Sequence, residues 1–202
     1  MGLGCRMDKL KHKQIQQVLG EAFLSYPLMK YAFEGQSPER FKKSVFTLYG
    51  CCANGCASYG NTYLHPSGDG AITYLHGQSF PLGFWKELKT GFLAVPVHLG
   101  LKATFRLIRH EEEVEPWIRK NSSDKMGYIW CIGVRPSAQG KGYSRHMMDW
   151  AVKEMKEKGI EEIWLKTEDA KNVGIYQKLG FTVERHIVAK SSGIDAWMMK
   201  RV

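Results

Sequence analysis

A glycine-rich turn is the segment of this sequence whose residues are best suited to chemistry. Residues 139–144 read Gln-Gly-Lys-Gly-Tyr-Ser and lie between an apolar run, 128–134, and an amphipathic stretch, 144–158. The first N–H groups of a helix have no partner within it and carry partial positive charge, so a strand, a glycine turn and a helix favour phosphate binding. Gly140 and Gly142 let the main chain approach an anion closely. The pattern predicts a phosphate-binding turn, with an ordinary strand-to-helix turn as the competing interpretation.

Other side chains in the turn narrow the kind of phosphate site. Lys141 and Arg145 can add charge-assisted contacts to an anion. A Walker-type loop requires Ser or Thr after its glycine-lysine pair, and Gly142 stands there instead. A dinucleotide-binding fingerprint requires a third glycine where Arg145 stands. Nucleotide binding in either of these two ways is therefore disfavoured.

The segments around the turn alternate between strand and helix patterns. The run 128–134 is short and almost continuously apolar, which is typical of a buried strand, and Pro136 ends it. The amphipathic helix after the turn ends at Gly159. Strands that alternate with helices predict a mixed α/β sheet. Of the other predicted helices, the first runs to about residue 25 and is interrupted by Pro27, and two more cover 38–57 and 172–179. The other predicted strands are 61–65, 71–76, 163–167, 182–189 and 195–200.

The turn and a second block together resemble the GNAT superfamily of N-acetyltransferases. That family carries Gln/Arg-x-x-Gly-x-Gly/Ala between its fourth strand and third helix, and residues 139–144 match it except that Ser144 replaces Gly or Ala. Residues 172–181 match the family's Asn-x-x-x-Tyr-x-x-x-Gly-Phe segment. The C-terminus is similar to the branch that includes puromycin N-acetyltransferase, on the basis of Gly193, Trp197, Met198 and Arg201.

The resemblance implies an α/β fold with a mixed, mostly antiparallel central sheet flanked by helices. It also implies a helical insertion before the fourth strand, because residues 77–121 exceed the usual connection of the family. The predicted organisation is one acetyltransferase domain over residues 1–202. Its parts are N-terminal helices and a hairpin in 1–76, the insertion in 77–121, and an acetyl-CoA-binding core in 126–202.

The same resemblance implies an enzyme, an acetyl-CoA-dependent N-acetyltransferase that needs no metal. In the family, the neutral amine of an acceptor, here expected to be a small molecule, attacks the thioester directly in a ternary complex. Tyr176 matches the family's general acid, with a packed helix tyrosine as the alternative role. Backbone groups of Ile132 and Val134 are implied to hold the pantetheine arm and the developing oxyanion. The implied cofactor-binding residues are Ile132, Val134, Gln139, Gly140, Lys141, Gly142, Tyr143, Ser144, Arg145 and Asn172, the last as an anchor, a helix N-cap or both.

The general base and the acceptor are not fixed by these motifs. Glu168 and Asp169 follow the fifth strand and are candidates for the base, but ordinary solvated loop acids are the favoured interpretation. His65 and His76 lie on the hairpin that faces the acceptor in the family, where a structural or surface role is favoured. Lys166 stands where the puromycin-type branch has Glu, which favours an acceptor with some negative charge.

Composition leaves two rival functions open. The net charge of +9 makes a basic nucleic-acid-binding module one rival, and a non-catalytic acyl-CoA sensor is the other. Nucleic acid and membrane are not predicted as partners, because the basic residues form no block and no apolar stretch is long enough to span a bilayer. The cysteines lack zinc-site spacing, so no metal is expected. Without a targeting segment, a cytoplasmic location is predicted.

Overall fold

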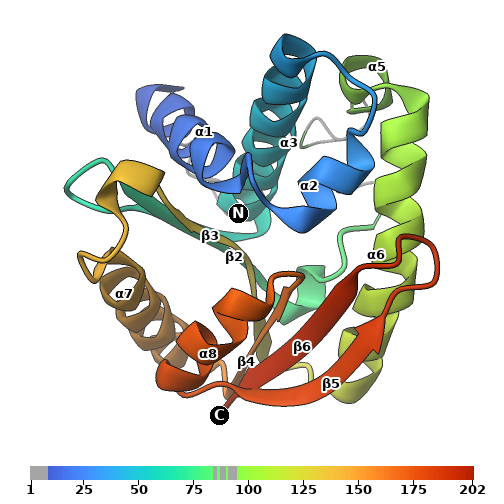
Figure 1. The fold of residues 1–202 in the computed structure, drawn as a ribbon. Coiled ribbons are helices and arrows are strands. Elements are labelled where there is room, and N and C mark those ends of the chain that lie inside the picture. Colours follow the sequence, from blue (N-terminus) through green and yellow to red (C-terminus); the bar gives the residue numbers. More distant parts are fainter. Residues whose placement is uncertain (1–8, 84–85, 87–89, 91–94) are drawn as a thin grey trace.

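A six-stranded sheet runs through the protein and separates two sets of helices (Figure 1). The computed structural model describes residues 9–83, 86, 90 and 95–202. The strands lie in the order β1-β2-β3-β4-β6-β5, and only β3 and β4 are parallel neighbours. This confirms the expectation of a mixed, mostly antiparallel sheet. The strands are β1 (Gly60–Leu64), β2 (Gly70–His76), β3 (Met126–Val134), β4 (Glu162–Thr167), β5 (Thr182–Val188) and β6 (Asp195–Arg201).

Both faces of the central strands are buried. In β2, Ala71 and Leu75 pack toward one set of helices, whereas Ile72 and Tyr74 pack toward the other. Successive side chains of a strand point to opposite faces, so this strand is apolar on both sides. The first face is covered by α1 (Lys9–Phe23), α2 (Pro27–Ala32), α3 (Pro38–Tyr59), α5 (Val95–Leu99) and α6 (Leu101–Asn121), and the second by α7 (Tyr143–Glu157) and α8 (Ala170–Lys178).

Local signals explain where several helices begin. Ser37 caps α3, because its side chain accepts a hydrogen bond from the N–H of Arg40, and Pro38 occupies the first turn. Pro27 likewise stands in the first turn of α2. The prediction that Pro27 only interrupts a helix was therefore incomplete, since proline suits a helix start. A second correction concerns α8, whose N-cap is Asp169 and not Asn172.

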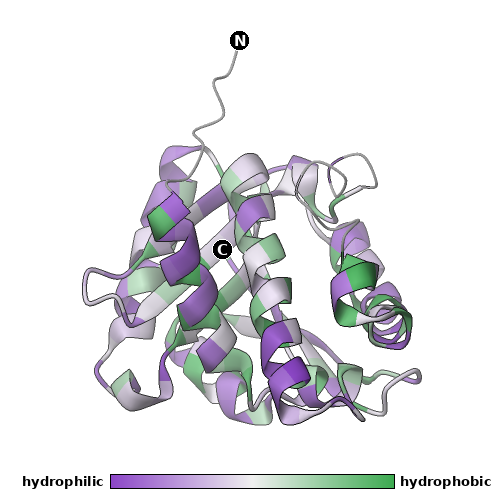
Figure 2. Cartoon of the chain, turned by 90° about the horizontal axis from the view of Figure 1, so that it is seen from above, coloured by the Kyte–Doolittle hydropathy of each residue, from purple (hydrophilic) through white to green (hydrophobic). Residues whose placement is uncertain are grey.

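The predicted insertion, 77–121, contributes a short 3-10 helix η1 (Gly77–Ser79), α5 and α6, while residues 84–85, 87–89 and 91–94 of it lie outside the described residues. In the described chain the insertion precedes β3, the third strand, because no strand comes before β1. Figure 2 shows that the helices carry both hydrophilic and hydrophobic residues, as expected for helices that bury one face. None of the described helices is long and apolar enough to cross a membrane.

The sheet opens between β3 and β4. The two strands pair only from Met126 to Tyr128 on β3, although β3 continues to Val134. On its other edge β3 remains paired with β2, with Trp130 as the extra residue of a bulge between two partner pairs. A bulge bends a strand and increases its twist. The pairing of β3 with β4 therefore stops at Tyr128 within the described sheet, and residues 131–134 have no strand partner on that side.

Candidate functional site

The predicted phosphate turn enters α7 without a side-chain cap. It follows a 3-10 helix, η3 (Pro136–Ala138), and both Gly140 and Gly142 adopt left-handed φ angles, +81° and +78°. Gly142 is the N-cap of α7, no side chain caps the helix, and its first turn contains no acidic residue. The start of α7 therefore presents bare N–H groups and an uncompensated partial positive charge.

These features fit the diphosphate of acetyl-CoA. Lys141 and Gly142 donate their backbone N–H groups to no residue in the described part of the chain. A Cβ added to Gly140 or Gly142 would meet nothing within 4 Å, so the space next to the main chain is open. Lys141 is exposed and has no ion pair among the described residues. Residues 140–145 thus offer the free amides and the cation that an anion at a helix start requires.

Other side chains of the turn connect it to neighbouring elements. The Gln139 amide donates to the carbonyl of Val134 at 3.4 Å, and the Arg145 guanidinium donates to a carbonyl at the end of α8 at 3.5 Å. The Tyr143 ring stacks on His65 with 4.2 Å between centroids. Ser144 is partly buried in the first turn of α7. These contacts hold the turn between the β1–β2 hairpin and α8.

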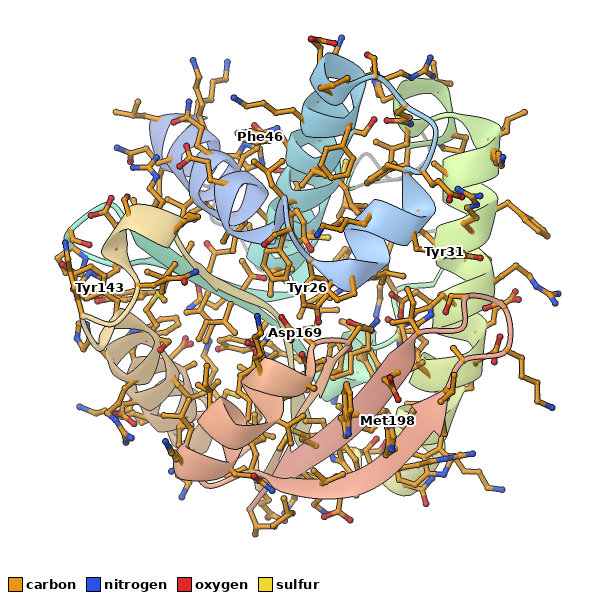
Figure 3. All side chains as sticks on the ribbon, in the orientation of Figure 1. Tyr26, Tyr31, Phe46, Tyr143, Asp169 and Met198 are labelled. Atoms are coloured by element: carbon orange, nitrogen blue, oxygen red, sulfur yellow. The ribbon has the colours of Figure 1, made fainter. Side chains whose placement is uncertain are left out.

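A cavity of about 540 Å³ lies beside the unpaired edge of β3. Its walls come from the α1–α2 connection, α3, α6, β3, β4 and α8. Ile132, Asn172 and Tyr176 line it, as three of the predicted site residues. Val134 and the turn at 139–145 do not line it and lie toward the far end of β3, where Figure 3 places Tyr143 well away from Tyr26. The open edge of β3 therefore connects the turn to the cavity.

Tyr176 and Asn172 reach the cavity from α8. The Tyr176 ring packs against Phe181, with 6.0 Å between centroids, and its hydroxyl donates to no group in the described chain. Burial, and then the negative charge of Glu168, raise the pKa of Tyr176, so its hydroxyl stays protonated at neutral pH. The Asn172 amide donates to the Thr167 hydroxyl at 3.3 Å, which fixes this side chain at the end of β4.

A buried charged network forms another part of the cavity wall. The Lys166 ammonium lies 2.7 Å from a carboxylate oxygen of Glu111 and 2.7 Å from one of Glu168. The side chains of Lys166 and Glu168 are only 9% and 3% exposed. Glu168 also contacts His110 at 3.3 Å and accepts a hydrogen bond from the Tyr26 hydroxyl at 2.7 Å. Tyr26 therefore ties the α1–α2 connection to the end of β4, close to the labelled Asp169 in Figure 3.

The network keeps both of its central groups ionised. Burial alone would raise the pKa of Glu168, but the Lys166 ammonium and the hydrogen bond from His110 outweigh it and lower that pKa to about 2. Burial alone would lower the pKa of Lys166, but the charges of Glu111 and Glu168 hold it well above its ordinary value. Glu168 is therefore a carboxylate at neutral pH and a weak proton acceptor.

Comparison with known proteins shows what this region is similar to. Residues 103–181 match the model of the acetyltransferase (GNAT) family. This range contains α6, β3, the glycine turn, α7, β4 and α8, and so includes one side of the cavity and the predicted phosphate site. Residues 103–181 are therefore similar to the GNAT family of acetyltransferases.

Relatives in sequence align with only part of the chain. Serotonin N-acetyltransferase 2, chloroplastic, of Oryza sativa subsp. japonica is 30% identical over 95 residues, covering 39% of this chain and 46% of that protein. Mycothiol acetyltransferase of Streptomyces scabiei (strain 87.22) is 26% identical over 91 residues, covering 43% of this chain and 30% of that protein. The chain therefore spans less than half the length of each of these curated relatives.

Solved structures extend the likeness to the whole fold. Arylalkylamine N-acetyltransferase 2 from Aedes aegypti superposes with a TM-score of 0.61 at 14% identity, over 97% of this chain and 96% of that one. A second solved acetyltransferase superposes with a TM-score of 0.52 at 16% identity, over 94% and 95% of the two chains. At such low identity the likeness shows a shared GNAT-like fold alone.

The structure corrects two expectations about titratable residues of the site, those for Glu168 and Lys166. Glu168 is buried in the cavity wall and is not a solvated loop acid. Lys166 is compensated by two carboxylates, so its replacement of Glu does not give the cavity a free positive charge. Asp169 is an N-cap, and neither His65 nor His76 lines the cavity, because His65 stacks on Tyr143 and His76 on Tyr74.

Sequence reasoning missed the acidic wall that α6 contributes to this site. Glu111, Glu112 and Glu115 line the cavity, and His110 lies fully buried behind Glu168. The available signal was the acidic run itself, with Glu111 and Glu115 one helical turn apart on one face. No group of three or more His, Cys, Asp or Glu side chains in the described ranges is arranged to hold a metal ion.

Proposed function

We propose that this protein transfers the acetyl group of acetyl-CoA to an amine of a small molecule. The observation that carries the proposal is the open edge of β3, which runs from an uncapped glycine turn to a cavity. The GNAT match supports acyl transfer from acetyl-CoA. Two relatives in sequence are named as acetyltransferases, one of them an N-acetyltransferase.

Three parts of the chain suit acetyl-CoA. The N–H groups of residues 140–145 suit its diphosphate. The main chain of β3 at residues 131–134 suits the amides of its pantetheine arm, because an open strand edge accepts an extended chain as it would another strand. When bound, acetyl-CoA supplies the activated acyl group, and Asn172 and Tyr176 line the cavity where an amine would meet it.

Acyl transfer creates negative charge on an oxyanion and then on the leaving thiolate, and groups near the cavity are suited to stabilise both. Free main-chain N–H groups of β3 close to Ile132 are candidate donors to a developing oxyanion. Tyr176 keeps its proton at neutral pH because its pKa is raised, so it has a proton to give to a leaving thiolate. Its ring packing against Phe181 fits this role and the structural alternative equally.

Glu168 is not the general base in this proposal. Its lowered pKa makes it a poor acceptor of a proton from an alkylammonium group, despite its place in the cavity wall. Its contacts with Lys166, His110 and Tyr26 make it the centre of the buried network instead. We propose that Glu168 positions the cavity wall and that deprotonation of the amine occurs elsewhere.

A binding comparison tests the proposal at its first step. The thermal unfolding of the protein is followed with acetyl-CoA, with free CoA and with a short oligonucleotide, because a ligand of the native state raises Tm by mass action. We expect both CoA compounds to raise Tm and the oligonucleotide to leave it unchanged. Stabilisation by the oligonucleotide alone would favour the basic nucleic-acid-binding module.

A transfer assay tests the second step. Release of the free CoA thiol is measured with acetyl-CoA and a broad panel of amines. We expect at least one amine to accelerate release well above the rate with acetyl-CoA alone. Binding of acetyl-CoA without acceleration by any amine would leave a non-catalytic acyl-CoA sensor as the better description.

A further inference from the structure

One face of α6 forms a wall of the cavity, and the chemistry of this wall changes along the helix. Over the eight steps from residue 107 to residue 115 the helix rises about 12 Å. The first part of this face is apolar and the later part carries carboxylates, so the wall has two chemically different ends. The lining residues lie three and four positions apart, on one side of the helix: Thr104, Leu107, Ile108, Glu111, Glu112, Glu115 and Pro116.

The acidic end exceeds the positive charge available in the cavity. Among the described residues that line it, four carboxylates, those of Glu111, Glu112, Glu115 and Glu168, face the single ammonium of Lys166. Lys166 is already held between two of them. The described part of the lining therefore carries more negative than positive side chains, within a chain whose net charge is +9. An acidic cavity in a basic protein attracts a cation and repels an anion.

Glu112 is the carboxylate best placed to meet a cation from solvent. It is exposed, it lines the cavity, and it has no ion pair with any residue in the described ranges. Its neighbour along the same ridge of α6 is Ile108, four residues earlier, which also lines the cavity and is half exposed. The mouth of the cavity thus pairs an apolar side chain with an uncompensated negative charge.

Other parts of the cavity lining offer an apolar surface. Leu28, Met29 and Val95 line the cavity together with Leu107, and the rings of Phe23 and Tyr49 stack nearby with 4.4 Å between centroids. Leu101 and Phe105, in the first turns of α6, are also exposed and apolar. Together with Ile108 they form an exposed apolar ridge outside the mouth of the cavity. Apolar surface of this kind favours a ligand with a hydrocarbon body over one rich in hydroxyl groups.

We infer that this cavity is the acceptor site and that its acceptor is a primary amine with an apolar aromatic or alkyl body and no carboxylate. The inference rests on the proposed acetyl transfer and deepens it. The hydrocarbon body lies against the apolar end of the α6 face, and the ammonium group is drawn to the carboxylate end. A carboxylate on the acceptor would add a like charge next to Glu111, Glu112 and Glu115, which opposes its binding in a partly desolvated site.

Matched acceptors test the inference directly. Phenethylamine is compared with phenylalanine, and hexylamine with 6-aminohexanoate, since each pair differs chiefly by a carboxylate. We expect kcat/KM to be about 100-fold or more higher for the amine without the carboxylate in both pairs. Spermidine represents a polar polycation and is expected to be a poorer acceptor than hexylamine. Equal or better transfer to the amino acids, or a preference for spermidine, would overturn the inference.

Variants of the acidic wall test its location. Glu112→Gln is expected to raise KM for phenethylamine about fivefold, the size of one exposed ion pair, with kcat unchanged. Glu112→Lys is expected to reduce the discrimination against phenylalanine about tenfold or more. Glu157→Gln removes an exposed carboxylate from the last turn of α7, away from the cavity, and is expected to change neither value. If all three variants behave alike, the acceptor does not contact this wall.

Separate binding measurements distinguish failure of the inference from failure of the proposed function. Binding of acetyl-CoA and of phenethylamine is measured by calorimetry, the amine both with and without CoA. If the wild-type protein binds phenethylamine but not acetyl-CoA, the proposed acetyl transfer is refuted. In that case, weaker binding of phenethylamine to Glu112→Gln would still support the acceptor site. Absence of phenethylamine binding with and without CoA, in a protein that binds acetyl-CoA, would refute the inference alone.

Discussion

At the scale of single residues, Tyr176 offers the most direct test of chemistry. Tyr176→Phe removes the hydroxyl of a cavity-lining residue and keeps the ring that packs against Phe181. If the hydroxyl protonates the leaving thiolate, turnover falls at least about tenfold while acetyl-CoA affinity stays nearly unchanged. Steady-state kinetics and calorimetry measure the two quantities. Unchanged turnover would remove Tyr176 from the mechanism and leave it as a packed helix tyrosine.

Lys166 tests the buried network at the same scale. Lys166→Met removes the ammonium held by Glu111 and Glu168, which leaves the carboxylate of Glu168 buried and less well compensated. Breaking a buried pair in this way costs about 3–5 kcal/mol of unfolding free energy. The double variant Lys166→Met/Glu168→Gln removes the uncompensated charge and is expected to recover much of the loss. Urea unfolding of the three proteins measures the effect, and a double variant no more stable than the single one would contradict it.

The pH dependence gives this prediction a second signature. The pKa of Glu168 is lower in the folded protein, about 2, than the ordinary value of about 4.3 for an unfolded chain. Its contribution to stability is therefore present above about pH 4.3 and is lost as pH falls toward 2. Thermal unfolding of wild type and Lys166→Met should differ most at neutral pH and converge as the solution becomes acidic. A constant difference across this range would show that Lys166 does not act through Glu168.

Lys166 also shows why the charge of a site cannot be predicted from one residue of the sequence. Its type suggested a positive acceptor site, because a lysine stands where the puromycin-type branch has Glu. Its partner Glu111 lies 55 residues away in sequence, on a helix whose packing against β4 no local pattern reveals. The same reason hid the burial of Glu168, which follows a strand and looked like a loop acid. The charge of a site depends on such tertiary partners and not on one residue type.

At the scale of elements, the two ends of α7 supply a matched pair of glycines. Gly142 precedes α7 and Gly159 follows it, with φ angles of +78° and +75°, and a Cβ would meet nothing within 4 Å at either position. Alanine at either site should cost about 1–2 kcal/mol of stability through backbone strain. Only Gly142→Ala should also weaken acetyl-CoA binding, because its Cβ would stand at the predicted phosphate site. Equal acetyl-CoA affinity in the two variants would argue against a diphosphate at this turn.

Sequence patterns predicted individual helices and strands better than how these elements pack against one another. The run 128–134 was recognisable because both faces of β3 are buried, and the glycine turn because its spacing is local. Helix α6 was predicted only as part of a helical insertion, and its acidic run gave no sign of facing a cavity. Helix α2 was missed because Pro27 is compatible with the end of one helix and with the first turn of the next.

At the scale of the whole molecule, the sheet consists of two halves that share a short seam. Strands β1, β2 and β3 form one half, and β4, β6 and β5 form the other, joined through three residue pairs between β3 and β4. Helix α6 spans the seam, since Val114 and Ile118 pack with Tyr128 of β3 and Trp164 of β4. No local pattern indicated this opening, which lies beside a bulge at Trp130, and a bulge bends a strand and increases its twist.

The seam leads to a prediction about exchange of backbone amides. Within β3, residues 131–134 lack a strand partner on the β4 side of the described sheet, so N–H groups on that edge should exchange with solvent faster than those bonded to β2. Acetyl-CoA bound along this edge should slow their exchange, as pairing with a new strand would. Hydrogen–deuterium exchange with mass spectrometry measures this, with β1 (Gly60–Leu64), at the distant edge of the sheet, as the internal control. Protection that appears equally in β1, or that is absent from 131–134 while acetyl-CoA stabilises the protein, would mean that the arm lies elsewhere and that the opening is only a consequence of the twist.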